Sequence, residues 1–78
     1  MADFTFEIKK HLGTISNRTT NAGEVWNREV NVVSWNGNKP KIDIREWSED
    51  HVRMSKGITL TAEEAEKLAI ILRDGIVM

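Results

Sequence analysis

Residues 41–47 alternate between two kinds of side chain, and this alternation constrains the fold more than any other feature of the sequence. Charged and aromatic side chains occupy every second position: Lys41, Asp43, Arg45 and Trp47. Isoleucine lies between them, at Ile42 and Ile44. Because successive side chains of a strand point to opposite faces, the pattern predicts a strand with one polar and one apolar face.

Three more segments have the composition of strands and are separated by turn-forming residues. Residues 4–16 form one long or interrupted strand, in which apolar and polar residues alternate at first and Gly13 is the weak point. Residues 25–35 form the next strand, after a polar hairpin loop at residues 17–24, and Asn36-Gly37 predicts a tight turn after it. Residues 48–53 predict a polar loop, and residues 56–60 predict a short fourth strand.

The C-terminal segment has the pattern of a helix. Thr61 and Glu64 have the spacing of a capping box, in which each side chain accepts a hydrogen bond from the other residue's backbone N–H. Gly75 is expected just beyond the helix end, at the C′ position. An apolar stripe at helical spacing lies between them, formed by Ala65, Leu68, Ala69 and Leu72. The predicted fold is therefore α+β, with the order ββββα.

The chain has more apolar surface than one thin sheet needs to cover it. Its 78 residues, without cysteine, predict a single domain over residues 1–78 with a thin core and no disulfides. Ile70, Ile71 and Ile76 widen the apolar surface beyond the helical stripe. Self-association is a common remedy for a thin core, so we expect a homodimer whose interface includes Leu68, Ile71 and Leu72.

The charge distribution excludes one class of function. The formal net charge of −1 argues against a protein that coats duplex DNA through bulk positive charge. Residues 7–60 hold nine basic and seven acidic residues, whereas residues 61–78 hold two basic and four acidic ones. One face of the sheet can therefore still be basic. No segment has the roughly 18 apolar residues of a membrane span, and the N-terminal residues lack a signal pattern, so we expect a cytosolic protein.

The sequence does not have the residue patterns of an enzyme. His11 and His51 are far apart and lack a second ligand at metal-type spacing, so surface or hydrogen-bonding roles are expected. Asp43 lies near other carboxylates, as acid–base catalysis requires, but the flanking Lys41 and Arg45 favour an ion pair. The glycines do not have the spacing of a phosphate-binding loop. We therefore expect no catalytic residue, no metal and no cofactor.

Trp47 suggests a binding function. It shares the predicted polar face with Lys41 and Arg45, and an indole beside cations is typical of proteins that bind single-stranded nucleic acids by stacking. In the alternative interpretation Trp47 covers the sheet edge or a dimer seam, and the cations are solvated. Trp35 lies near the start of the same hairpin. Trp26 fits a position in the core and a position on the binding face equally well.

Two runs of sequence resemble the single-stranded-DNA-binding domain of the positive cofactor four family, also called transcriptional coactivator p15. They are Lys41-Ile42-Asp43-Ile44-Arg45-Glu46-Trp47 and Lys56-Gly57-Ile58-Thr59-Leu60-Thr61. The resemblance covers residues 12–72, and the chain length is closest to the small YdbC-like bacterial relatives. It implies a curved antiparallel sheet, a helix that packs against a second copy in a homodimer, and grooves for unpaired DNA.

The resemblance also implies which residues bind the strand. The bases expected to contact phosphates are Arg28, Lys39, Lys41, Arg45 and Lys56. The aromatic residues expected to stack on bases are Trp35 and Trp47. Counting by two places Arg28 opposite Trp35, so Arg28 reaches the same face only through a bulge.

These observations predict a non-catalytic, largely sequence-independent binder of single-stranded DNA, with RNA as a second ligand. Such a protein would act in transcription, replication or repair, in the cytosol or, in a bacterium, at the nucleoid. Its partners would be the strand and a second copy of the chain. The alternative is a protein-interaction module whose exposed tryptophans and isoleucines bind a polypeptide.

Overall fold

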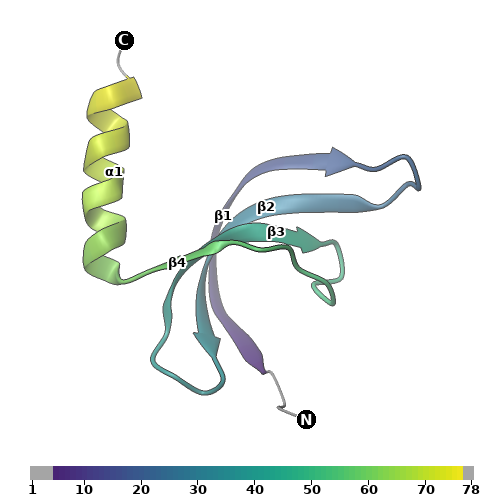
Figure 1. The fold of residues 1–78 in the computed structure, drawn as a ribbon, viewed down its shortest axis with the longest axis horizontal. Coiled ribbons are helices and arrows are strands. Elements are labelled where there is room, and N and C mark those ends of the chain that lie inside the picture. The colour runs from purple at the N-terminus through teal and green to yellow at the C-terminus, as the bar shows by residue number, and fades with distance from the viewer. Residues whose placement is uncertain (1–4, 77–78) are drawn as a thin grey trace.

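The computed structural model describes residues 5–76. Over this range the chain forms four strands and one helix: β1 (Phe6–Thr19), β2 (Val25–Trp35), β3 (Lys41–Ser48), β4 (Ile58–Leu60) and α1 (Ala62–Ile76). The strands pair antiparallel in the order β1-β2-β3-β4, and the sheet is strongly curved (Figure 1). The predicted ββββα order is confirmed. The predicted start of the first strand, at Phe4, lies outside the described residues.

The β2–β3 hairpin forms the centre of the sheet. Asn36 and Gly37 have φ angles of 51° and 75°, in the left-handed region that asparagine and glycine adopt most readily. The N–H of Asn38 donates to the carbonyl of Trp35 at 2.9 Å. From this turn to the far end of the hairpin, β2 and β3 pair without a register shift. The predicted strand at residues 25–35 and the Asn-Gly turn are confirmed.

Strand β1 is longer than predicted. Residues 17–19, which the sequence places in a loop, pair with residues 25–27, so only residues 20–24 connect the two strands. The register shifts three times, leaving Lys9, Leu12 and Ile15 as extra residues on β1. Such bulges bend a strand and increase its twist, which lets β1 follow the curve of β2. Gly13 does not interrupt the strand, because it pairs with Val30.

The register divides the sheet into two faces. Cross-strand partners share a face, so Glu29 and Arg45 lie on one face, while the next pair, Val30 and Ile44, lies on the other. The predicted alternation in residues 41–47 is therefore confirmed. It separates the polar residues Asp43 and Arg45 from the isoleucines that face the other way.

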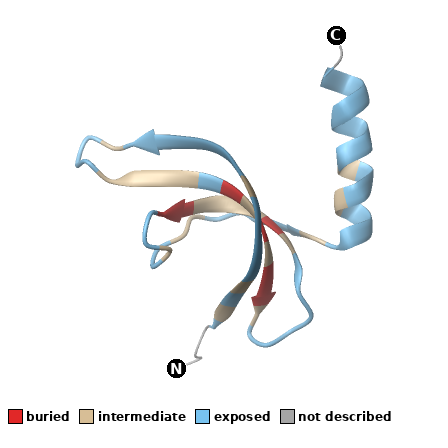
Figure 2. Cartoon of the chain, turned by 180° about the vertical axis from the view of Figure 1, so that it is seen from behind, coloured by how far each residue is buried: buried red, intermediate tan, exposed pale blue. Residues whose placement is uncertain are grey.

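The polar side is the concave side of the sheet. Phe6 on β1 and Trp47 on β3 come from strands that both flank β2, yet their ring centroids are 5.1 Å apart. The sheet must therefore curve towards this face, which we call the concave face. Among the described apolar side chains, Val33 and Trp47 are fully buried, and the buried segments lie on β2 and β3 (Figure 2).

Strand β4 lies against β3 at a point where a side chain does not fit. A Cβ atom added to Gly57 would collide with the carbonyl oxygen of Ile44 and with the Cβ of Arg45. Glycine at this position therefore lets the chain approach β3 before Ile58 pairs with Ile44. The predicted strand over residues 56–60 is thus shorter, because pairing begins only after this approach.

The helix begins as predicted but ends later. The hydroxyl of Thr61 accepts from the N–H of Glu64 at 3.1 Å, and the Glu64 carboxylate accepts from the N–H of Thr61 at 2.9 Å. This reciprocal pair confirms the capping box. The prediction that Gly75 ends the helix is wrong, because α1 continues to Ile76 and Gly75 lacks the positive φ of a C′ glycine.

Helix α1 does not cover the sheet of its own chain. No residue of α1 within the described range is buried, and the helix extends away from the strands (Figures 1 and 2). The Cα radius of gyration is 14.1 Å, whereas a compact domain of this length has a value of about 11.5 Å. The accessible surface is 5963 Å², against about 4,800 Å² for a compact monomer of this mass. A large apolar surface is therefore left uncovered.

Replacing Gly57 tests the close approach of β4 to β3. Gly57→Ala is expected to lower the free energy of unfolding by about 1–3 kcal/mol, because the new methyl group overlaps backbone atoms that cannot move independently. Urea unfolding measures the change. Gly13→Ala is the matched control, since an added Cβ meets nothing within 4 Å there, and its effect should stay within about 0.5 kcal/mol. Equal stability of the two variants would contradict this account of Gly57.

Candidate nucleic-acid interface

A buried ion pair fixes the polar part of the concave face. Arg45 donates to Asp43 through Nε and Nη2, at 2.6 and 2.7 Å. Asp43 is fully buried and also accepts from the hydroxyl of Thr59 on β4, at 3.2 Å. The Arg45 side chain is only 13% exposed. The prediction that Asp43 is an ion-pair partner is confirmed, and Arg45 is held in one orientation.

Arg45 lies over the ring of Trp35, the last residue of β2. The guanidinium carbon is 4.5 Å from the centre of the Trp35 ring. The ring of Phe6 also packs against Trp35, with the two ring centroids 5.9 Å apart. Trp35 is half-buried, so part of this residue is accessible next to a cation. An aromatic ring beside a cation is the kind of surface on which a planar group stacks.

The prediction that Trp47 lies exposed as a stacking surface is wrong. Trp47 does share the face of Arg45, but it is fully buried. Phe6 and His51 pack against it, with ring centroids 5.1 and 5.5 Å from that of Trp47. Because the sheet curves towards this face, β1 and the loop after β3 close over the indole. Trp47 is therefore a core residue of the concave face.

Arg28 is not part of the same site. Its cross-strand partner is Glu46, on the convex face, and its Nη2 lies 3.9 Å from the Glu46 carboxylate. The bulge that would bring Arg28 to the face of Trp35 does not form, since the register shifts occur on β1 and β2 pairs regularly with β3. Its prediction as a residue of the concave site is therefore wrong.

Basic residues divide into paired arginines and unpaired lysines. All five arginines make ion pairs with carboxylates. Four exposed lysines make no ion pair within residues 5–76: Lys10, Lys39, Lys41 and Lys56. Lys39 and Lys41 follow the turn next to Trp35, and Lys56 precedes the segment that passes Arg45. These lysines have the charge available for an anionic ligand.

The convex face carries a second group of charges at the far end of the β1–β2 hairpin. Arg18 donates to Glu46 through Nε and Nη2, at 2.8 and 3.1 Å. This hydrogen bond holds the pKa of Glu46 below its ordinary value and raises the pKa of Arg18. Arg18 and Arg53 lie over the ring of Trp26, 5.9 and 5.5 Å from its centre. Trp26 therefore packs against arginines on the side opposite to Trp35.

Sequence reasoning missed a group of polar residues further along the concave face. Glu29 accepts from Asn31 and His51, and Asn31 in turn bonds to His11. The predicted hydrogen-bonding roles of the two histidines are confirmed, but their meeting at Glu29 was not expected. The alternation of Glu29 and Asn31 in β2 was the available signal, since it places two polar side chains on one face of a central strand.

A short turn presents His51 to this group. Asp50 accepts from the N–H of Val52 at 3.0 Å and from the hydroxyl of Ser48 at 2.7 Å. Together these hydrogen bonds lower the pKa of Asp50. His51 itself has a φ of 60°, a strained conformation for a residue with a side chain. The turn is thereby held in the shape that directs the imidazole towards Glu29.

Two further findings bear on the possible chemistry. Within residues 5–76, no three His, Asp or Glu side chains lie close enough together to hold a metal ion. No helix in the same range combines the length and the apolar composition needed to cross a membrane. The chemical groups on and beside the concave face are therefore aromatic rings, exposed lysines and a hydrogen-bonded carboxylate.

Comparison with known proteins places the chain in a family. Residues 23–71 match the family described as Transcriptional Coactivator p15 (PC4), a span that runs from the start of β2 into α1. A protein of Treponema pallidum (strain Nichols), described only as uncharacterized, is 41% identical over 70 residues, which cover 90% of this chain and 78% of that protein. The chain belongs to the transcriptional coactivator p15 family.

Truncation of Trp47 tests its place in the core. Trp47→Ala is expected to lower the free energy of unfolding by about 3–5 kcal/mol, because it removes the largest fully buried side chain. The indole Nε1 makes no hydrogen bond within the described residues, so Trp47→Phe removes volume alone and should cost less. Thermal unfolding compares the two variants. An alanine variant that melts like the parent would show that Trp47 is not a core residue.

Proposed function

We propose that the protein binds single-stranded nucleic acid on the concave face, without catalysis and without a cofactor. The observation that carries this proposal is the half-buried Trp35 beneath Arg45, close in the chain to Lys39 and Lys41, which make no ion pair among the described residues. A planar surface beside positive charge suits a base and its phosphate. Membership of a family named for a transcriptional coactivator supports a role in transcription, and a binder of this kind would also serve replication or repair.

The roles of the residues follow from their surroundings. Lys39, Lys41 and Lys56 would contact phosphates, because their charges are exposed and unpaired within residues 5–76. Arg45 would act mainly by orienting Trp35, because Asp43 already compensates its charge. Trp35 would stack on a base. The base would have to be unpaired, since a duplex holds its bases inside the helix.

The second part of the proposal is a homodimer built on the convex face. An open apolar groove lies between the sheet and α1, lined by Val30, Ile42, Ile44, Leu60, Ala65, Leu68, Ala69 and Leu72. Ile71 and Ile76 are each 65% exposed beside it. The chain exposes roughly 1,100 Å² more surface than a compact monomer of its mass, comparable to the about 800 Å² that each partner buries in a stable interface. A second copy of the chain has the same uncovered apolar surface on its helix and sheet, and this surface would match the first.

Strand preference and salt dependence test the binding site. Fluorescence anisotropy should show much tighter binding to a labelled oligo-dT strand than to the duplex of the same length. Lys41→Ala should weaken binding and reduce the slope of log K against log salt by about 0.7 if it removes one phosphate contact. Lys67→Ala is the control, since Lys67 lies on α1 and pairs with Glu63. Equal affinity for strand and duplex would defeat the stacking proposal, and salt-independent binding would favour an apolar protein interface.

Sedimentation equilibrium tests the dimer. The mass should be near twice 8.9 kDa, and Ile71→Asp should return the protein to the monomer, because a charge in an apolar interface costs several kcal/mol. Ile15→Asp is a matched control, because Ile15 on β1 is 60% exposed but does not line the groove. A folded parent that sediments as a monomer at micromolar concentration would overturn the dimer. Dissociation by both variants alike would place the interface elsewhere.

A further inference from the structure

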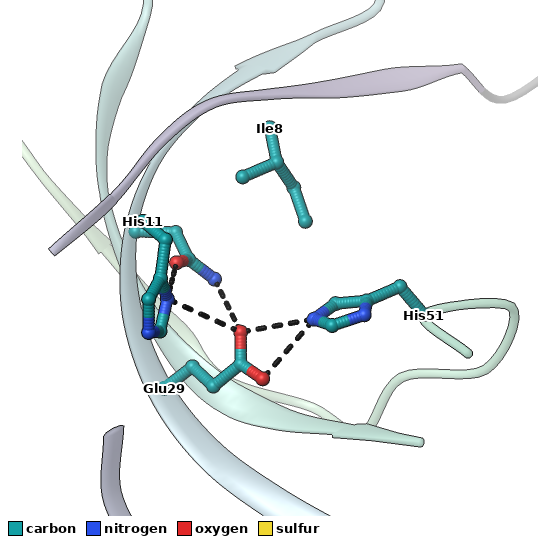
Figure 3. Close-up of a pocket in the computed structure, with 5 residues that line it drawn as sticks. Ile8, His11, Glu29 and His51 are labelled. Atoms are coloured by element: carbon teal, nitrogen blue, oxygen red, sulfur yellow. Dashed lines mark hydrogen bonds and ion pairs between the residues drawn. The ribbon is translucent and has the colours of Figure 1, made fainter. Parts of the chain in front are cut away.

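A small cavity opens on the concave face next to the proposed strand-binding residues. Its volume is about 270 Å³, and its lining consists of Ile8, His11, Glu29, Asn31 and His51 (Figure 3). These residues come from β1, β2 and the turn after β3. Glu29 is the cross-strand partner of Arg45, so the cavity lies on the same face of the sheet as Arg45 and Trp35.

Glu29 provides the carboxylate among the residues that line this cavity. Its side chain is only 6% exposed. Oε1 accepts from Asn31 Nδ2 at 3.0 Å and from His51 Nε2 at 3.1 Å. Oε2 accepts from the same His51 nitrogen, also at 3.1 Å. Since one N–H serves both oxygens and each oxygen has two lone pairs, the carboxylate can still accept further hydrogen bonds.

The surroundings hold Glu29 firmly, whereas His51 is partly exposed to solvent. Asn31 is fully buried, and its carbonyl oxygen lies 2.7 Å from His11 Nδ1, so the amide that supports Glu29 is itself anchored. The His51 side chain is 39% exposed. In Figure 3 the His51 ring and the His11 ring lie on opposite sides of the Glu29 carboxylate. Ile8 lies beside the space between the His51 ring and the carboxylate. Among the hydrogen-bond partners of Glu29, the partly exposed imidazole is therefore the one that a ligand entering from solvent meets.

The chemistry of the cavity favours one kind of ligand. A carboxylate repels a phosphate but accepts hydrogen bonds from the N–H groups of a base. The cavity is smaller than the about 300–1,000 Å³ of sites for drug-sized ligands, which suits a single planar ring system. Ile8 offers an apolar surface to such a ring. Among the bases, guanine presents two adjacent N–H groups, whereas thymine presents one N–H between two carbonyl oxygens.

We infer that this cavity takes one unpaired base of the bound strand and favours guanine, with Glu29 as the specificity-determining residue. The guanine N1–H and N2–H groups would each donate to one oxygen of Glu29, in place of the single N–H of His51. The inference rests on the proposed strand binding, because the phosphates and Trp35 would deliver the base to the cavity. It adds a base preference to an otherwise sequence-independent site.

The experiment compares a short oligo-dT strand with the same strand carrying one central guanine. The guanine strand should bind more tightly by roughly fivefold to 150-fold, the range of a bidentate contact to a base. Replacing that guanine by hypoxanthine, which lacks the N2 amino group, should remove most of the gain. This control changes only the DNA and therefore does not depend on the folding of any variant.

Two protein variants complete the test. Glu29→Gln should abolish the guanine preference, measured as the ratio of the affinities for the two strands, because the amide has one acceptor oxygen and a competing NH₂ donor. His51→Ala should keep or increase the preference, because it removes the competing N–H. Binding of oligo-dT without any gain from guanine would overturn the inference and leave the proposed function intact. Failure to bind either strand would overturn the proposed function, and a preference that survives in Glu29→Gln would exclude Glu29 as its source.

Discussion

The arrangement of the concave face depends on the buried carboxylate of Asp43. A charge with no exposure to water is stable only when it is paired and hydrogen-bonded, and Asp43 meets this need with Arg45 and Thr59. The contact with Thr59 ties β4 to β3, and the contact with Arg45 directs its guanidinium over Trp35. One interaction thus links the edge of the sheet to the proposed stacking surface. The close passage of Gly57 beside Arg45 belongs to the same arrangement.

Because the sheet is curved, its concave face encloses a small core and its convex face stays open. The bulges of β1 let the sheet close around Phe6 and Trp47, which creates a small core inside the concave face. Closing that side leaves the convex face open, with Ile42 and Ile44 lining a groove that α1 does not fill. The small core and the uncovered groove are therefore two results of the same bend. A second subunit would stabilise the chain because the bend has moved the apolar residues of β3 to the outside.

The sequence predicts the elements of this fold better than it predicts the site. Period-two alternation, the Asn-Gly turn and the capping box depend on neighbours in the chain, and all three are confirmed. The burial of Trp47 depends on Phe6 and on a turn after β3, so the alternation places it on the correct face but does not reveal that the face closes. The grouping of His11, Glu29 and His51 likewise arises from strand register and curvature, which local patterns do not specify.

The charge of the protein limits how the proposed site could hold a strand. With a net charge of −1 and every arginine paired, few cations remain to neutralise phosphates. Electrostatic attraction, which provides most of non-specific nucleic-acid binding, is therefore weak here. A carboxylate on the binding face weakens it further, unless that carboxylate contacts a base rather than a phosphate. If the proposed site binds a strand, most of the affinity would therefore come from stacking and from hydrogen bonds to base edges, both of which need an unpaired strand.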